Sequence, residues 1–325
     1  MNKKQSYATL LLILVTQVMV SQAKVASNGS MDSPNILFVF SDDHAWQSIG
    51  AYGGRLKEVA HTPNIDKLAS EGMLFRKCFV ANALCGPSRA AVLTGKYGHR
   101  NGVTWNRNTN FDGSQQTFPK MMRQNGYQTA IIGKWHLASV PTGFDYFDVM
   151  KGQGRYYNPF LQRGNAEGLQ DTRTVVGYNS DIVGDLTIEW LKNGRDKSKP
   201  FMLMSQFKAT HHGFCPGPEE YDLYDDVHIP EPDNLFDDFS YRGTAIREQT
   251  LTLYKNLSHA ILVGDPGELG ELNPDQRKAW DAYRSKFSKP FQAMNLNWSD
   301  QSRELSRFKY QSLLKNFLAS GAGID

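Results

Sequence analysis

The residues best suited to chemistry follow predicted strands directly. Asp42 and Asp43 come after an apolar run of strand length, Lys134 and His136 after a second run, and His211 after a third. Taken singly, such residues have ordinary explanations as turn residues, solvated lysines or structural histidines. Open α/β sheets, however, bind ligands beyond the carboxyl ends of their strands. Paired carboxylates suit Ca²⁺ or Mg²⁺, and lysine with histidine supplies charge and proton transfer for an oxyanion ester. Their convergence predicts a catalytic site.

A second candidate feature is the stretch CGPSRAAVLTG, residues 85–95. Pro87 suits the first position of a helix and Gly95 suits its C-terminal end, so we expect Cys85 just ahead of a short helix. The free N–H groups of that helix end favour an anion, and Arg89 can add a two-pronged guanidinium. The stretch predicts a reactive side chain facing a bound oxyanion.

The elements that must position these residues alternate between strand and helix. The predicted strands cover residues 35–40, 73–80, 127–132 and 201–207. The predicted helices cover residues 62–72, the stretch after Cys85, 117–126, and 180–194 with Ser180 as the N-cap. Continuous apolar strands, such as 35–40, are typical of a sheet buried on both faces. This order predicts a doubly wound, mostly parallel α/β sheet flanked by helices.

The later part of the chain predicts two further elements. Residues 221–240 are acidic and contain Pro230 and Pro232, which favours a surface loop. Apolar residues at helical spacing from Leu305 to Leu318 predict an amphipathic final helix.

Composition excludes some classes of protein. The 325 residues include 36 basic and 33 acidic ones, a formal net charge of +3 that is no footprint of nucleic-acid binding. Lys3 and Lys4 precede a short apolar run and small residues up to Ala23, which predicts a signal peptide over 1–23, an exported protein, and no stable membrane insertion. Of the three cysteines, we expect Cys78 and Cys215 to be buried as small hydrophobic residues.

The stretch from Cys85 to Arg89, continuing to Thr94-Gly95, resembles the Cys-x-Pro-Ser-Arg signature of the formylglycine-dependent sulfatases, members of the alkaline-phosphatase-like superfamily. The supporting motifs at 35–43, 133–136 and His211 follow in the family's order. The stretches FKATHHGF and YDDVHIPEPDNLFDD look most like bacterial enzymes acting on 6-sulfated N-acetylglucosamine. The resemblance therefore implies a sulfuric ester hydrolase acting on a sulfated glycan.

The resemblance also implies how the nucleophile is made. Cys85 would be oxidised to formylglycine by a separate maturation enzyme, and its hydrated aldehyde would attack sulfur. Asp42, Asp43 and the modified Cys85 would be ligands of Ca²⁺, with Mg²⁺ as the other candidate. Arg89 would stabilise the hydrated aldehyde.

The remaining site residues would act on the sulfate and its leaving group. By the same resemblance, Lys134 and His211 would hold the sulfate, and one of them would protonate the leaving group. His136 would bond to the formylglycine hydroxyl. His212 stands where related sequences commonly carry arginine, and its role stays open.

One departure concerns the metal site. Sulfatases take further ligands, an Asp followed by Asn, Gln or His, from a later strand end, and no such motif follows Phe207. We therefore expect residues 24–325 to be the N-terminal portion of a sulfatase catalytic domain, without its C-terminal part. The chain ending at Asp325 would be inactive, and Phe308 and Phe317 on its final helix would lack a partner.

Two alternatives stay open. The chain could be a truncated or degenerate sulfatase-like protein that binds glycan without turnover. It could also be a phosphatase or phosphodiesterase of the same superfamily, although those enzymes use Ser or Thr where this sequence has Cys85.

Overall fold

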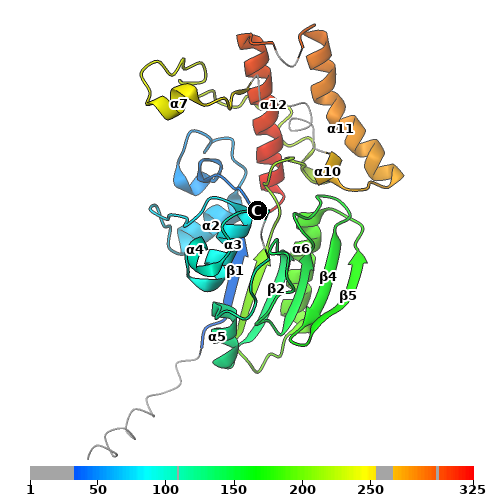
Figure 1. The fold of residues 1–325 in the computed structure, drawn as a ribbon. Coiled ribbons are helices and arrows are strands. Elements are labelled where there is room, and N and C mark those ends of the chain that lie inside the picture. Colours follow the sequence, from blue (N-terminus) through cyan, green and yellow to red (C-terminus); the bar gives the residue numbers. More distant parts are fainter. Residues whose placement is uncertain (1–32, 108–109, 254–265, 298–299) are drawn as a thin grey trace, which may run out of the picture. The chain divides into compact units, whose positions relative to one another are not determined.

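A six-stranded sheet carries the site residues (Figure 1). The computed structural model describes residues 33–107, 110–253, 266–297 and 300–325. The strands, in spatial order, are β1 (Ile36–Phe40), β6 (Phe201–Gln206), β2 (Gln128–Lys134), β3 (Tyr146–Met150), β4 (Phe160–Asn165) and β5 (Gly168–Thr174). The first four are parallel, and β4 and β5 pair in antiparallel fashion. The predicted mostly parallel α/β sheet is confirmed.

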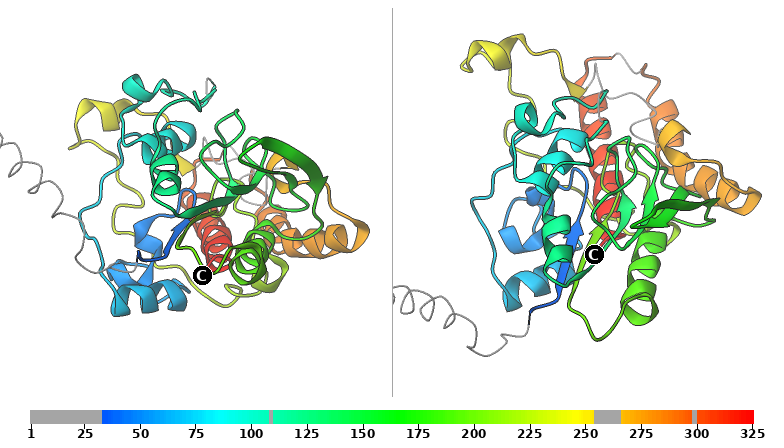
Figure 2. Two further views of the ribbon diagram at one scale, coloured as in Figure 1. Left: turned by 90° about the horizontal axis from the view of Figure 1, so that it is seen from below. Right: turned by 60° about the horizontal axis from the view of Figure 1, so that its bottom comes forward.

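Helices lie on both faces of this sheet (Figure 1; Figure 2). The helices are α2 (Pro63–Glu71), α3 (Cys85–Thr94), α4 (Gly98–Asn101), α5 (Phe118–Gln124), α6 (Asn179–Glu189), α7 (Thr244–Glu248), α10 (Pro266–Leu269), α11 (Pro274–Ala293) and α12 (Arg303–Ala322). Short 3₁₀ turns cover Trp46–Ser48, Gly50–Tyr52 and Pro218–Glu220, and a π turn over Trp190–Gly194 extends α6. None of the described helices combines the length and apolar character that crossing a membrane needs.

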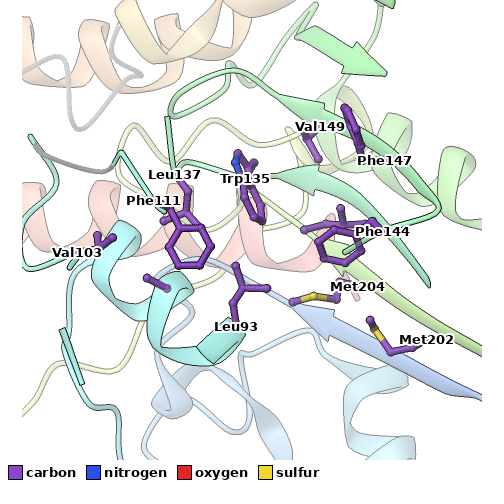
Figure 3. Close-up of a cluster of buried hydrophobic side chains, with 12 residues drawn as sticks. Leu93, Val103, Phe111, Trp135, Leu137, Phe144, Phe147, Val149, Met202 and Met204 are labelled. Atoms are coloured by element: carbon purple, nitrogen blue, oxygen red, sulfur yellow. The ribbon is translucent and has the colours of Figure 1, made fainter. Parts of the chain in front are cut away.

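Two hydrophobic clusters fill the space between sheet and helices. On one face, Leu93 of α3 packs with Trp135, Phe147 and Met204 (Figure 3). On the other face, Ile182 and Val183 of α6 and Trp190 pack with Ala130, Ile132 and Leu203. Successive strand residues point to opposite faces, so the continuous apolar run of β2 serves both clusters. This double burial fixes the strand ends from which the polar residues emerge.

Several predicted elements match the structure. Thr117 is the N-cap of α5, which ends at Gln124 with Asn125 as its C-cap, and Gly95 ends α3 with a positive φ of 65°. Residues 221–240 contain no assigned helix or strand, although Tyr224 and Ile229 are buried in a core cluster. Cys215 is buried as expected, whereas Cys78 is exposed, so that prediction is wrong.

Other predictions need correction. Residues 73–80 form no strand, because no described segment pairs with them, and Phe79 is exposed. β1 lies at an edge of the sheet as described, with Val39 56% exposed, so it is not buried on both faces. The N-cap of α6 is Tyr178, and Ser180 lies inside the helix. Cys85 is the first residue of α3 rather than a residue ahead of it, and Pro87 is consequently the third.

Three strands were not predicted. β3 continues the parallel sheet, and β4 and β5 form a hairpin whose sequence is mostly polar. The Asn165 side chain accepts the backbone N–H of Glu167 at 2.9 Å and so shapes the turn. Most residues of β4 and β5 are exposed or only partly buried, so these strands give little apolar signal, although β4 also pairs with β3 and its Leu161 lies in a core cluster.

The final helix is longer than predicted and is covered. Leu318 of α12 is buried in a cluster with Leu56 and Ile229, and Leu305 in the first turn of α12 is buried as well. Phe308 lies with its ring centre 6.0 Å from that of Phe291 on α11. The expectation that this apolar face lacks a partner is therefore wrong, because residues 221–235 and α11 supply one.

Candidate active site

Three charged side chains meet at the carboxyl edge of the sheet. Asp42 follows β1, Lys134 ends β2, and Arg89 comes from the first turns of α3; all three are buried. The Lys134 ammonium donates a hydrogen bond to the Asp42 carboxylate, and Arg89 Nη2 lies 3.4 Å from Asp42 Oδ2. The backbone N–H of Asp42 donates to the Ala209 carbonyl at 3.1 Å, which ties β1 to the segment after β6. One carboxylate thus faces two cations.

The charges of this group are set by their surroundings. Burial alone would raise the pKa of Asp42, but the cations of Lys134 and Arg89 outweigh it and hold the pKa below its usual value. Burial lowers the pKa of Lys134 to about 8. Burial, followed by the charge of Asp42, raises the pKa of Asp43. At neutral pH Asp42 is therefore ionised. It lies beside Asp43, whose charged form a bound cation would stabilise.

Arg89 is held firmly and still has unused donors. Its Nη1 donates to the Lys134 carbonyl at 2.8 Å and to the side-chain oxygen of Gln206, while the guanidinium lies 5.3 Å from the centre of the Phe40 ring. Within the described residues, Arg89 Nε and Nη2 are buried without a hydrogen-bond partner. Buried donors are rarely left unpaired. These two nitrogens are well suited to a ligand oxygen.

A pocket lies at the N-terminal end of α3, and Cys85 forms part of its lining. The pocket has a volume of about 330 Å³. Its polar lining residues include Asp42, Asp43, Cys85, Ser88 and Arg89. Cys85 is half-buried, and burial, followed by the nearby charge of Asp42, raises the pKa of its thiol. The unmodified thiol is therefore a poor thiolate nucleophile at neutral pH.

Two of the predicted histidines also reach this edge. His136 is buried with a φ of 52°, and its Nδ1 has no hydrogen-bond partner among the described residues. Burial, reinforced by the cations of Lys134 and Arg89, lowers the pKa of His136 to about 4. His211 is buried, and its Nε2 lies 4.0 Å from Asp43 Oδ2. Burial first, and then the cations of Lys134 and Lys208, lower its pKa to about 2.

The structure thus brings the predicted site residues together at one edge of the sheet. Sequence reasoning missed three residues that support them: Gln206, Lys208 and Glu268. Gln206 ends β6 and accepts from Arg89, while Lys208 pairs with Glu268. Gln206 is the last residue of β6 and Lys208 follows that strand, as His211 does, so their position at a strand end was an available signal. Glu268 lies in a polar stretch that gave none.

The donor set fits a hard divalent cation. Asp42, Cys85 and His211 place one ligand atom each within 4.8 Å of one another. Asp43 adds a second carboxylate from the adjacent position. Burial first, and then repulsion by Asp42, raise the pKa of Asp43, and a cation would stabilise its charged form. Carboxylate oxygens are the ligands that Ca²⁺ and Mg²⁺ prefer. Among the described residues, Asp42 and Asp43 are therefore the ones suited to hold such an ion.

Comparison with known proteins supports the resemblance to sulfatases that the sequence motifs indicated. Residues 34–258 match the sequence model of the Sulfatase family. The chain is 37% identical to an N-acetylglucosamine-6-O-sulfatase of Bacteroides thetaiotaomicron, an alignment that covers 99% of this chain and 58% of that protein. It is 38% identical to human N-acetylgalactosamine-6-sulfatase over 58% of this chain and 41% of that protein.

A solved structure supports the fold as well. The structure of BT4656 in complex with its substrate D-glucosamine-2-N,6-O-disulfate superposes with a TM-score of 0.77 at 37% identity, covering 90% of this chain and 60% of that one. The fold described above is a mostly parallel α/β sheet with a polar pocket beside its carboxyl edge, and the chain belongs to the sulfatase family. It spans about 58% of the length of the Bacteroides sulfatase.

Proposed function

We propose that the protein is a sulfuric ester hydrolase that removes O-sulfate from a sulfated glycan. The observation that carries the proposal is the pocket lined by Cys85, at the start of α3, together with Arg89 and the carboxylates of Asp42 and Asp43. Because the chain spans little more than half of its relative, the activity is proposed for the whole protein. In that protein, residues 24–325 would form the N-terminal portion of the catalytic domain.

Cys85 would act after oxidation to formylglycine by a maturation enzyme. The raised thiol pKa supports this, because the unmodified thiol offers little nucleophilic thiolate. One hydroxyl of the hydrated aldehyde would attack sulfur, and the bond from sulfur to the glycan oxygen would break as that oxygen takes up a proton. The second hydroxyl would then lose its proton as the bond to sulfate breaks, which regenerates the aldehyde and releases sulfate. Water would rehydrate the aldehyde.

The surrounding side chains would share this work. Arg89 would hold the hydroxyls of the modified residue, and His136 would accept or donate at the same group. Lys134 and His211 would hold the sulfate, with one of them protonating the departing glycan oxygen. Lys134 is suited to that exchange because its pKa of about 8 lies near neutral pH.

A divalent cation, which we take to be Ca²⁺ with Mg²⁺ as the alternative, would bind Asp42, Asp43 and modified Cys85. When bound, it would supply positive charge that activates the hydroxyl and neutralises the sulfate oxygens. The chain's own contribution is the pair of adjacent carboxylates after β1, held in place by the backbone hydrogen bond from Asp42 to Ala209.

The substrate we propose is 6-O-sulfated N-acetylglucosamine within a glycan. Support comes from the Bacteroides relative, named as an N-acetylglucosamine-6-O-sulfatase, and from BT4656, solved with a 6-O-sulfated glucosamine. We further propose that the protein is exported by means of residues 1–23, a stretch that lies outside the described residues.

A substrate panel tests the proposal. Protein purified from its native host is assayed on N-acetylglucosamine-6-sulfate, N-acetylgalactosamine-4-sulfate and an aryl phosphate, with the Cys85→Ala variant as the blank. We expect the highest kcat/KM on the 6-sulfated glucosamine and none above background for the variant. A higher kcat/KM on the phosphate would reassign the protein to the phosphatase branch of the superfamily.

A further inference from the structure

One carboxylate lies among three basic side chains beside the proposed catalytic pocket. Glu268 belongs to α10, and its side chain is 15% exposed. It accepts a hydrogen bond from the Lys208 ammonium. Its Oε2 lies 3.9 Å from His211 Nδ1, and its Oε1 lies 4.0 Å from His212 Nε2. Lys208, His211 and His212 all belong to the segment that follows β6.

Lys208 neutralises Glu268 and cannot reach the solvent. It is wholly buried, lies 4.9 Å from the centre of the Tyr156 ring, and donates a second hydrogen bond to the Gln153 carbonyl at 3.4 Å. A buried charge needs a partner of opposite sign, so Lys208 anchors the Glu268 carboxylate.

The backbone fixes Glu268 in place independently of its side chain. The Tyr156 N–H donates to the Glu268 carbonyl and the Tyr157 N–H to the Leu269 carbonyl, both at 2.8 Å. Leu269 is buried in an aromatic cluster with Tyr156 and Trp280. Gly270 follows with a φ of 103°, and a Cβ added there would lie 2.2 Å from the Tyr157 carbonyl oxygen. α10 is therefore docked against the residues that precede β4.

The His211 ring has two different sides. Its Nδ1 lies 3.3 Å from the His212 carbonyl oxygen and 3.9 Å from Glu268, so both neighbours on this side are acceptors. An N–H at Nδ1 is the arrangement that suits them. The opposite atom, Nε2, faces Asp43. Glu268 and the His212 carbonyl thus direct Nε2 toward the pocket.

We propose that Glu268 is a positioning residue for His211: its negative charge, 3.9 Å from Nδ1, favours the proton on that nitrogen, so that Nε2 faces the sulfate ester. This inference rests on the proposed function. Outer carboxylates that fix the tautomer and orientation of a ligating histidine act in this way, and their loss typically costs about 10- to 100-fold in activity. The Lys208 ammonium pairs with the Glu268 carboxylate. The proposed series of contacts therefore runs from Lys208 to Glu268, then to His211 and to the substrate.

The test compares Glu268→Gln and Glu268→Ala with Glu271→Gln as the matched control. Glu271 lies three residues further on, its side chain is 92% exposed, and it pairs with Arg155 at 3.6 Å on the surface. On N-acetylglucosamine-6-sulfate we expect kcat/KM to fall about 10-fold for Glu268→Gln and up to about 100-fold for Glu268→Ala. Glu271→Gln should stay within twofold of the wild type. Formate should restore part of the Glu268→Ala activity, because it can occupy the space of the missing carboxylate.

A readout that does not depend on activity accompanies the kinetics. In protein labelled with ¹⁵N-histidine, the His211 signals, assigned by their loss in His211→Gln, should show the proton on Nδ1 in the wild type and a changed tautomer population in Glu268→Gln. If this signature is present but no sulfate ester is hydrolysed, the proposed function fails and the positioning assignment stands. A wild-type His211 proton on Nε2, or unchanged tautomer and kcat/KM in Glu268→Gln, would overturn the inference.

Discussion

Gly133 is the position where a single methyl group should do most damage to the site. It lies in β2 with a φ of 100°, paired with Gln206 of β6. A Cβ built there would lie 2.0 Å from the Gln206 carbonyl oxygen. Real Cβ contacts stay beyond 3.0 Å, so β2 and β6 would have to separate by about 1 Å. Lys134 and Gln206, which both hold Arg89, flank this contact.

The magnitude of Gly133→Ala can be built from its parts. The positive φ costs about 1–2 kcal/mol in a residue with a Cβ, overpacking about 1–3 kcal/mol, and one weakened strand hydrogen bond about 1 kcal/mol. Together these predict a loss of about 3–6 kcal/mol from a total stability of about 5–15 kcal/mol. At roughly 2–4 °C per kcal/mol, Tm should fall by about 6–24 °C.

The control variant Gly126→Ala separates the effect of backbone strain from that of a steric clash. Gly126 has a φ of 85°, and a Cβ added there meets no described atom within 4 Å. This control carries the backbone strain without the clash, and we expect it to lose only about 1–2 kcal/mol. Both variants are measured by thermal melting and urea denaturation, together with kcat/KM. A Gly133→Ala protein that melts within 2 °C of Gly126→Ala and keeps full activity would refute the reasoning.

Three further predictions concern nucleophile, metal and pH. Cys85→Ala should abolish sulfate release while Tm changes little, because this half-buried side chain makes few core contacts; a large fall in Tm would contradict that. Adding Ca²⁺ should raise the Tm of the wild type but not of Asp43→Asn, and an equal rise in both would exclude Asp43 as a ligand. Burial, and then the charge of Asp181, raise the pKa of Glu220, so its charged form disfavours the folded state above that pKa. Glu220→Gln should therefore raise Tm at pH 8, with a gain that shrinks as the pH falls and the wild-type carboxyl takes up its proton. Melting curves from pH 5 to 8, with the adjacent Glu219→Gln as the control, check this; a gain that grows toward acid pH would contradict it.

Much of the site could be predicted from sequence because it follows a general rule of parallel sheets. Asp42, Lys134 and His211 lie at or shortly after the ends of apolar strands, and the carboxyl ends of such strands meet at one edge. Gly95 correctly predicted the end of the helix after Cys85, whereas the helix begins two residues before the position that Pro87 predicted. The predictions that were wrong concern elements whose structure depends on a pairing strand elsewhere in the chain rather than on the local pattern of apolar residues. Residues 73–80 are apolar but unpaired, whereas β4 and β5 are polar and pair with each other.

Glu268 shows the same limit within the site. It lies 56 residues or more along the chain from the histidines it approaches, and its place depends on backbone bonds to Tyr156 and Tyr157. Neither the surrounding sequence nor helical spacing carries that information. α12 is similar, because its burial depends on Leu56 and Ile229, which lie in distant loops.

The measurement that tests the central claim most directly is mass spectrometry of the peptide containing Cys85. It is made on protein purified from the native host in a preparation that hydrolyses N-acetylglucosamine-6-sulfate. We expect a substantial fraction of Cys85 as formylglycine, and a specific activity that rises in proportion to that fraction across preparations. An active preparation in which Cys85 is an unmodified thiol throughout would contradict the proposed nucleophile.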